Sequence, residues 1–284
     1  MKKYTLLLSL ILFNSFLFSQ LTYVPDDNFE QKLIDLGYDD VLDDYVKTIN
    51  IRGVVGLNVS NLEIKDLSGI QDFSSLESLD CSYNELTSLD VSNNPLLDVL
   101  VCSTNQLTSL DVSKNILLKY LDCNGNALTS IDVSNNTFLK DLICYNNQLT
   151  SLDVSNNKSL VSLWLQNNRL TSLDVSNTLV ERLLCGYNRL KILDVSMTNS
   201  LRILECNNNL IKNLDVSKNT SLTKLLCFSN RLTSLDVSYN RSLELLMCQN
   251  NQMACIKVSE SQLNNNVSYW GMGQSSQWSL NCSN

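Results

Sequence analysis

The chain has 284 residues, with 21 basic against 29 acidic side chains, a net charge of −8 at pH 7, and no histidine. Such an acidic balance repels phosphate backbones, so nucleic acid is not an expected partner. The lack of histidine excludes histidine-based triads and histidine-ligated metals. No phosphate-binding glycine loop, nucleophile elbow or tuned carboxylate pair stands apart, so we expect neither an enzyme nor a cofactor.

Residues 1–19 are typical of a secretory signal peptide. Two lysines precede an apolar run from Tyr4 to Phe18, and Ser19 supplies a small residue before a cleavage point. The run is shorter than the roughly 20 apolar residues of a spanning helix, which favours secretion over a membrane anchor. We therefore expect a secreted or cell-surface protein with no membrane span after signal removal. Removal takes two of the 21 basic residues and no acid, leaving 19 against 29, a net charge of −10.

Residues 20–56 predict a cap with a short helix. Asp26 or Asp27 can cap the helix, and Gly37 can end it. Its apolar stripe comprises Phe29, Leu33, Ile34 and Leu36. An acidic group follows, with the oxygen ligands that calcium prefers, but without the spacing and turn glycine of a calcium loop. We interpret this group as a solvated acidic turn; it consists of Asp39, Asp40, Asp43 and Asp44.

A repeated unit occupies residues 57–252. The stretch Leu86–Gln106 returns seven more times with small changes, and its length is 21 residues except in Leu170–Arg189, which is one residue short. Ile64–Glu85 is a 22-residue version, and residues 47–63 resemble a degenerate first coil. A fixed period of this size indicates a solenoid, in which each unit buries its apolar edge against its neighbours.

Each unit contains a similar short pattern twice. One half reads LxxLxCxxNxL, as in Leu118–Leu128, and the other reads LTSLDVSxN, as in Leu149–Asn157. Both alternate apolar and polar residues, which is the period of a half-buried strand. The pattern predicts a flattened coil with a strand on each side, stacked into two parallel sheets at about 5 Å per coil.

These segments match the leucine-rich repeat signature, L-x-x-L-x-L-x-x-N/C-x-L. They resemble the nested bacterial 21-residue type called IRREKO, and the two end segments resemble those of secreted leucine-rich repeat proteins of Bacteroidetes. The resemblance implies a β-rich, right-handed solenoid over residues 57–252 with an N-terminal cap at 20–56 and a C-terminal cap at 253–284. It also implies a binding function, because leucine-rich repeats usually bind.

Stacking turns each position of the unit into a column of equivalent side chains. An asparagine column, running from Asn84 to Asn251, suits the pairing of backbone groups at a turn, and a weaker one includes Asn94, Asn115, Asn136, Asn157, Asn219 and Asn240. The cysteine column runs Cys81, Cys102, Cys123, Cys144, Cys185, Cys206, Cys227 and Cys248. Leu165 fills the same position in one unit, so we interpret the column as an apolar filler. Cys255 and Cys282 lie outside the register and predict a disulfide that closes the C-terminal cap.

An aspartate column should face outward from the second sheet. It runs Asp90, Asp111, Asp132, Asp153, Asp174, Asp194, Asp215 and Asp236, with serines on both sides. We favour a structural role, in which the carboxylates accept hydrogen bonds from neighbouring groups. Weak binding of divalent cations, with Asp111, Asp132, Asp153 and Asp174 as candidates, and ordering of ice or a crystal surface are the alternatives.

The other sheet has outward columns that vary from unit to unit and include large apolar residues. Such a surface is typical of protein binding, although isolated exposed apolar residues are also normal. The predicted partner-binding residues are Tyr120, Ile143, Tyr145, Trp164, Arg182, Leu184, Tyr187, Leu226, Phe228 and Met247. We therefore expect a non-catalytic module that recognises an extracellular protein or a surface glycan. A structural or cation-dependent surface protein that uses the aspartate column is the alternative.

Overall fold

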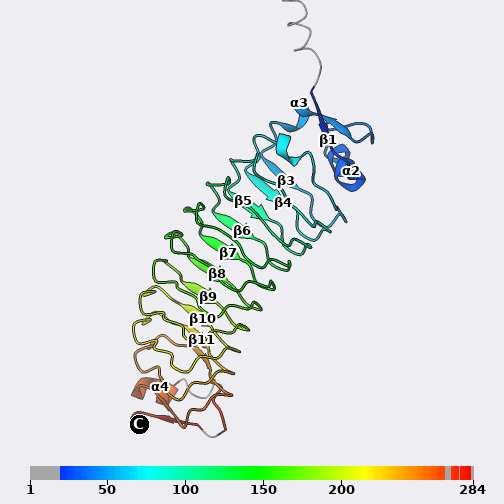
Figure 1. Cartoon of the computed structure of the whole chain (residues 1–284). Helices are drawn as coiled ribbons and strands as arrows, with labels where there is room; N and C mark the ends of the chain where they lie inside the picture. Colours follow the sequence, from blue (N-terminus) through cyan, green and yellow to red (C-terminus); the bar gives the residue numbers. More distant parts are fainter. Residues whose placement is uncertain (1–19, 266–269, 275, 283–284) are drawn as a thin grey trace, which may run out of the picture.

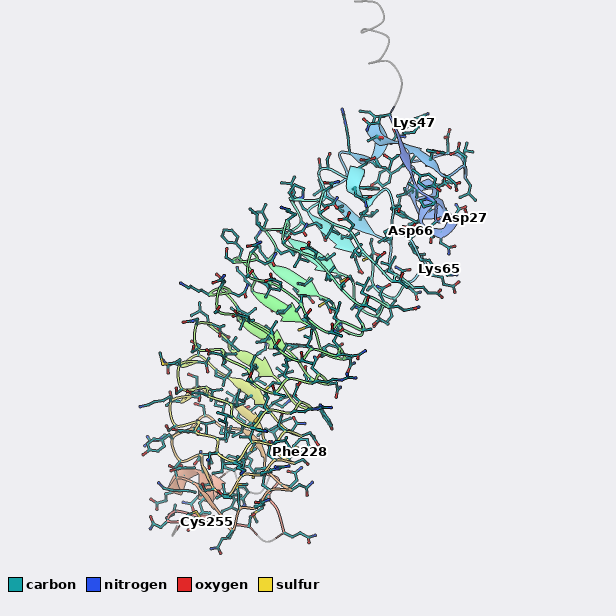
Figure 2. The ribbon with its side chains drawn as sticks, viewed as in Figure 1. Asp27, Lys47, Lys65, Asp66, Phe228 and Cys255 are labelled. Atoms are coloured by element: carbon teal, nitrogen blue, oxygen red, sulfur yellow. A yellow bond between two sulfur atoms is a disulfide. The ribbon has the colours of Figure 1, made fainter. Side chains whose placement is uncertain are left out.

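The computed structural model describes residues 20–265, 270–274 and 276–282, so the signal peptide expected at residues 1–19 lies outside the described residues. The described residues form one elongated solenoid of stacked coils (Figure 1). Asp27 marks the N-terminal cap at one end and Cys255 the C-terminal cap at the other (Figure 2). None of the described helices is long and apolar enough to cross a bilayer.

The N-terminal cap consists of a two-stranded antiparallel sheet and two helices. Strand β1 (Leu21–Tyr23) pairs with β2 (Tyr45–Lys47), α2 (Asp27–Asp35) lies between them in sequence, and α3 (Thr48–Ile51) follows. Gly37 adopts a positive φ of 76° immediately after the C-cap residue of α2, as a helix-ending glycine does. The helix and its termination by Gly37 are therefore as predicted.

Asp26 joins this helix to the solenoid. Its Oδ1 atom accepts hydrogen bonds from the backbone N–H groups of Asn28 and Phe29, so Asp26 is the N-cap residue. Its Oδ2 atom accepts from the backbone N–H groups of Lys65 and Asp66 at 2.7 and 3.1 Å. The Phe29 ring also stacks on Phe73, with 6.3 Å between ring centroids. One carboxylate thus caps the helix and fixes it against the first coils.

The solenoid carries one long parallel sheet of ten strands. Residues one unit apart face each other across it, as Leu142 faces Leu163, and the central leucine of each inner strand is buried. The predicted stacking of equivalent residues is therefore confirmed. A short 3-10 helix, η1 (Ile70–Asp72), precedes the second strand. The strands are β3 (Gly56–Asn58), β4 (Ser78–Asp80), β5 (Val99–Val101), β6 (Tyr120–Asp122), β7 (Asp141–Ile143), β8 (Ser162–Trp164), β9 (Arg182–Leu184), β10 (Ile203–Glu205), β11 (Lys224–Leu226) and β13 (Leu245–Met247).

The second flank of the coil does not form the continuous second sheet that the alternation predicted. In the described chain, its pairing is limited to the isolated bridges Asp90 to Asp111 and Asp174 to Asp194 and to a short C-terminal sheet. The backbone N–H groups that a β-ladder between coils would need instead form hydrogen bonds within their own coil. The N–H of Ser92 donates to the Asp90 carboxylate, and the N–H of Asn94 donates to the Val91 carbonyl. Local turns therefore replace the ladder on this flank.

Two ladders of side-chain amides hold successive coils together. Asn105 is representative of the first: its Oδ1 accepts from the N–H of Leu86, and its Nδ2 donates to the carbonyls of Cys81 and Cys102. Asn115 represents the second, with Nδ2 donating to the carbonyls of Val91 and Asn94 at 2.9 Å each. Both asparagines are buried, which confirms their structural role.

The eight column cysteines are buried and free, and Leu165 is buried in the same column. Burial raises the pKa of Cys206 to about 12 and raises the pKa of Cys144 well above its usual range. These thiols are therefore neutral, inert apolar fillers at neutral pH.

The C-terminal cap is a three-stranded parallel sheet of β12 (Leu235–Asp236), β14 (Cys255–Lys257) and β15 (Gln277–Ser279), with α4 (Glu260–Asn265) after β14. Cys255 and Cys282 form the predicted disulfide. Trp270 and Trp278 pack edge to face, with 5.7 Å between ring centroids. The cap thus covers the last coil with a crosslinked segment.

Candidate functional site

The candidate site is the outward surface of the ten-stranded sheet, which we call the variable face. It consists of the first and third residues of strands β5 to β11 and β13, and of the residues that lie two positions after each of these strands. Tyr120 and Arg182 are first residues of strands; Ile143, Trp164, Leu184, Leu226 and Met247 are third residues; Tyr145 and Phe228 lie two positions after their strands. Tyr187 lies in the turn after β9, where its φ is 55° and its exposed fraction is 53%.

An apolar strip crosses three neighbouring strands at the middle of this face. Ile143, Trp164 and Leu184 are in register across β7, β8 and β9. Asp122 on β6 and Glu205 on β10 continue the same row at its two ends. Because parallel strands lie about 4.8 Å apart, the three apolar side chains lie next to one another in one row that is bounded by carboxylates.

Trp164 is fixed by its neighbours on this face. Its ring lies 6.4 Å from that of Tyr145, at an interplanar angle of 33°. The indole Nε1 donates to the hydroxyl of Ser162 at 2.9 Å, and Nε of Arg182 donates to the same hydroxyl at 3.3 Å. An Nη2 atom of Arg182 lies 3.7 Å from the carboxylate of Asp141. The indole and the guanidinium are therefore held in defined orientations by their neighbours.

Exposure differs among the predicted residues. The expectation that Ile143 stands in water is wrong: its exposed fraction is 8%, because it lies in register between Asp122 and Trp164. Trp164, Tyr145 and Leu184 are half-buried and present part of their surface. Ile143 therefore supports the strip, whereas its neighbours form the accessible part.

Burial raises the pKa of Asp122, against the hydrogen bonds from the backbone and side-chain amides of Asn124, which lower it. Burial also raises the pKa of Tyr120, and the nearby charge of Asp122 adds to that effect. These polar groups are already partly removed from water.

A second apolar group lies closer to the C-terminal cap. Leu226 and Met247 are in register on β11 and β13, and Phe228, labelled in Figure 2, follows β11. Lys224 Nζ contacts Glu205 Oε1 at 2.6 Å between this group and the first strip. The variable face therefore presents two apolar areas separated by an ion pair.

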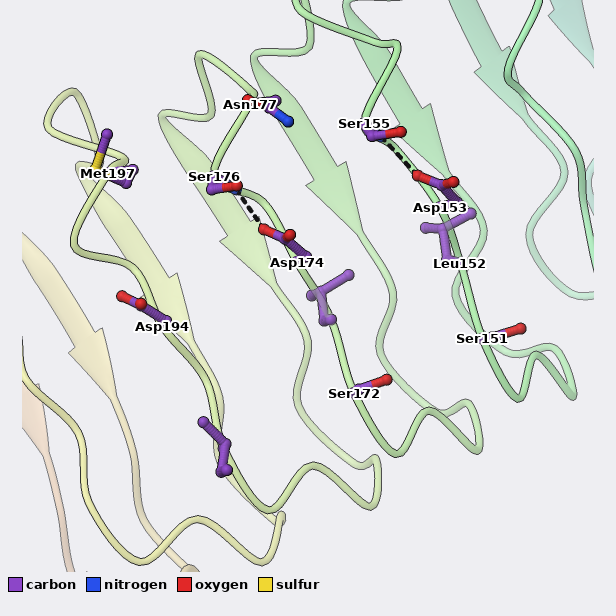
Figure 3. Close-up of a pocket in the computed structure, with 12 residues that line it drawn as sticks. Ser151, Leu152, Asp153, Ser155, Ser172, Asp174, Ser176, Asn177, Asp194 and Met197 are labelled. Atoms are coloured by element: carbon purple, nitrogen blue, oxygen red, sulfur yellow. Dashed lines mark hydrogen bonds between the residues drawn. The ribbon is translucent and has the colours of Figure 1, made fainter.

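The aspartate flank has a different construction. In each of its eight coils the aspartate Oδ1 accepts from the backbone N–H of the serine two residues later, at 2.8 to 2.9 Å. Figure 3 shows two of these pairs, Asp153 with Ser155 and Asp174 with Ser176. These bonds support the structural role. In the described part of the chain, the column aspartates form no group of three closely spaced ligand atoms that would favour a metal ion.

An open groove of about 620 Å³ lies on this flank and is lined by Asp153, Asp174 and Asp194. Ile192 and Met197 border it with exposed fractions of 77% and 65%. The sequence interpretation missed this groove. The sequence signal was the presence of Ile192 at a repeat position that is usually serine and of Met197 at one that is often asparagine.

The interpretation also missed Asp141 and Ser162 as residues of the variable face. Both are small polar side chains at the first position of a strand, where Tyr120 and Arg182 were selected for their size. Their role depends on contacts across strands, which the residue types do not show by themselves.

Ten in-register strands with amide and thiol columns give this chain the leucine-rich repeat fold. In particular, it is similar to the functional domain of InlJ from Listeria monocytogenes, a domain described as including a cysteine ladder, with 32% identity and a TM-score of 0.82 over 90% of this chain. The chain spans 62% of that protein's length.

Two further solved structures share the fold. A leucine-rich repeat protein of Leptospira interrogans is 23% identical, with a TM-score of 0.64, and the match covers 83% of this chain and 69% of that one. The plant peptide hormone receptor RGFR1, in complex with RGF2, is 20% identical, with a TM-score of 0.60 over 74% of this chain and 37% of that one. No protein-family model and no curated protein matches the sequence.

Proposed function

We propose that the chain is a secreted, non-catalytic recognition module that binds a protein through its variable face. The observation that carries the proposal is the preorganised Tyr145 and Trp164 pair beside Arg182. Tryptophan, tyrosine and arginine are the residues that most often dominate binding energy at protein interfaces. Side chains that are already fixed lose little further entropy when a partner binds.

The contrast between the two flanks supports the same conclusion. The aspartate flank repeats one hydrogen-bonded turn in every coil, as the Asp111 and Ser113 pair does. The variable face changes from coil to coil, although its strands have the same register throughout. Nothing in the packing of the coil requires Trp164 or Arg182 at their positions. The plant receptor, which has the same fold, is in complex with RGF2 and supports the use of such a solenoid for recognition.

The proposal is tested by capturing extracellular proteins and glycans on the immobilised mature chain and measuring the affinity of each captured candidate. We expect Trp164→Ala and Tyr145→Ala each to weaken binding of a protein partner at least about 30-fold, as removal of a hot spot worth about 2 kcal/mol does. Tyr239→Ala is the matched control, since Tyr239 is an aromatic residue outside the variable face with an exposed fraction of 56%.

Equal affinities for the chain, the two face variants and the control would overturn the assignment of the face. If a glycan is captured in place of a protein and the same two variants lose glycan binding, the variable face remains the binding surface but the class of partner changes. Circular dichroism and melting of each variant separate a loss of binding from a loss of folding.

A further inference from the structure

We propose that the N-terminal cap binds one calcium ion between Asp27, Glu30 and Asp44. One carboxylate oxygen from each residue lies within 4.8 Å of the others. Asp27 and Glu30 come from the first turn of α2, and Asp44 directly precedes β2. Among the described residues, this is the one group of three acidic, cysteine or histidine side chains with such spacing. Figure 2 shows Asp27 in the cap, at the end of the solenoid opposite Cys255.

Glu30 has a buried carboxylate oxygen that is available to a cation. Its side chain is fully buried. The Oε1 atom accepts hydrogen bonds from the backbone N–H groups of Asp43 and Tyr45, at 3.0 Å each. The Oε2 atom is buried and has no hydrogen-bond partner. A buried carboxylate oxygen without a partner is costly, and a bound cation would satisfy it.

No side chain of the described residues neutralises this group. None of the ion pairs in the described chain includes Asp27, Glu30 or Asp44. Three carboxylates at this separation repel one another, and the repulsion is strongest where one of them is shielded from water. A divalent cation reverses the sign of these interactions.

The geometry favours calcium over magnesium. Calcium accepts six to eight oxygen ligands at about 2.3 to 2.6 Å, so ligands on opposite sides of the ion are about 4.8 Å apart. Magnesium requires a tighter and more regular octahedron and usually keeps several waters, so three carboxylates whose oxygens are up to 4.8 Å apart suit calcium better. Asp27 lies at the surface, so water can complete the coordination shell.

The binding would link two segments of the cap. The backbone carbonyl of Asp44 accepts from the N–H of Val24 at 2.8 Å, which fixes the chain beside β1. An ion shared by Asp44, Glu30 and Asp27 would clamp the loop before β2 onto α2. Of the acidic turn singled out in the sequence, this site uses only Asp44, and it is separate from the aspartate column.

Calcium titration of the chelator-treated chain, followed by calorimetry and thermal melting, tests the proposal. We expect one site and a rise in Tm of about 5 °C or more at calcium concentrations well above Kd. Glu30→Gln, which retains an acceptor for the two N–H groups, and the double variant Asp27→Asn/Asp44→Asn are expected to weaken binding at least about 100-fold. Asp40→Asn, an exposed acid of the same loop, is the matched control and should bind as the unaltered chain does.

Calcium binding at the cap is separated from binding on the aspartate flank by the triple variant Asp111→Asn/Asp132→Asn/Asp153→Asn. This variant should retain the full calcium affinity of the unaltered chain. Absence of heat and of any Tm shift up to about 10 mM calcium, beyond the range of weak extracellular sites, would overturn the proposal. Undiminished affinity in Asp27→Asn/Asp44→Asn would overturn it as well, and this variant remains decisive if Glu30→Gln does not fold. Partner binding by the variable face is measured in a separate experiment, so either proposal can fail while the other still stands.

Discussion

The side-chain amide of Gln262 donates a hydrogen bond to the backbone carbonyl of Asn240 at 2.9 Å, as the amide of Asn240 donates to that of Asn219 at 2.8 Å. Gln262 also donates to the carbonyl of Val237 at 3.0 Å. Helix α4 thereby provides the next amide of the second asparagine ladder from outside the repeat. The C-terminal cap closes the solenoid through polar pairing as well as through apolar cover.

Gln262→Ala is therefore expected to destabilise the chain. It leaves two carbonyls at the end of the ladder without their donor, and one unmade buried hydrogen bond costs about 1 to 3 kcal/mol. Urea unfolding measures the change. Asn264→Ala, at an exposed position of the same helix, should change stability by less than about 0.5 kcal/mol. Equal stabilities of the two variants would contradict the role of Gln262.

Asn115→Ala is expected to cost about 2 to 4 kcal/mol, because Asn115 donates to two buried carbonyls in the preceding coil. Asn115→Thr should cost less. The chain itself uses Thr178 and Thr198 at equivalent positions, where the hydroxyls donate to the carbonyls of Val175 and Val195. Urea unfolding of both variants checks the order, and a threonine variant less stable than the alanine variant would contradict it.

The column cysteines are expected to resist alkylation in the folded chain. All eight are buried, and burial raises the pKa of Cys248 to about 12, so reactive thiolate is scarce at neutral pH. Iodoacetamide labelling with mass spectrometry should modify none of the eight in the native chain and all of them after denaturation. Rapid native labelling of Cys123 or Cys144 would show that the interior is open.

Acid is expected to destabilise the fold. The backbone N–H and then the hydroxyl of Ser176 lower the pKa of Asp174, and Ser113 acts in the same order on Asp111. A carboxylate with a lowered pKa in the folded chain contributes stability that is present above its unfolded value. That contribution is lost as the pH falls through the folded value. Burial raises the pKa of Asp122 and of Asp39, and these two groups act in the opposite direction.

Because eight column aspartates have lowered pKa values, we expect Tm to fall as the pH drops below about 4. Thermal melting from neutral to acidic pH measures this effect. The triple variant Asp111→Asn/Asp132→Asn/Asp153→Asn should show a smaller fall, since its amides can still accept from serine but do not titrate. A Tm that stays constant or rises in acid would contradict the assigned direction.

Much of the architecture was predictable, because a solenoid repeats one local solution. The identical spacing of Asn84 and Asn105, and of Cys81 and Cys102, placed equivalent residues above each other, and the structure confirms that stacking. The alternation wrongly predicted a continuous second sheet. The strand-like half of the unit also contains Asp90 two residues before Ser92, and their hydrogen bond turns the backbone before a ladder can form.

The sequence predicted which face of the solenoid would carry the candidate site, but it did not predict the side-chain contacts on that face. The variation of its columns predicted the face. The contact of Trp164 with Ser162 depends on side-chain rotamers within one strand, and that of Arg182 with Asp141 crosses from one strand to another, so neither could be predicted from the sequence. The cap cluster shows the same limit more strongly. Asp27, Glu30 and Asp44 have no motif in common, and they meet only because α2 and the loop before β2 fold against each other.

The amino-acid sequence by itself determined the period of the coil, its buried columns and the disulfide of the cap, since these depend on spacing that is short and constant along the chain. The tertiary structure decided which flank became a sheet, which outward side chains remained accessible, and which carboxylates came together. Those outcomes depend on competition between neighbouring hydrogen bonds and on contacts between distant segments, and neither quantity is contained in a repeating pattern.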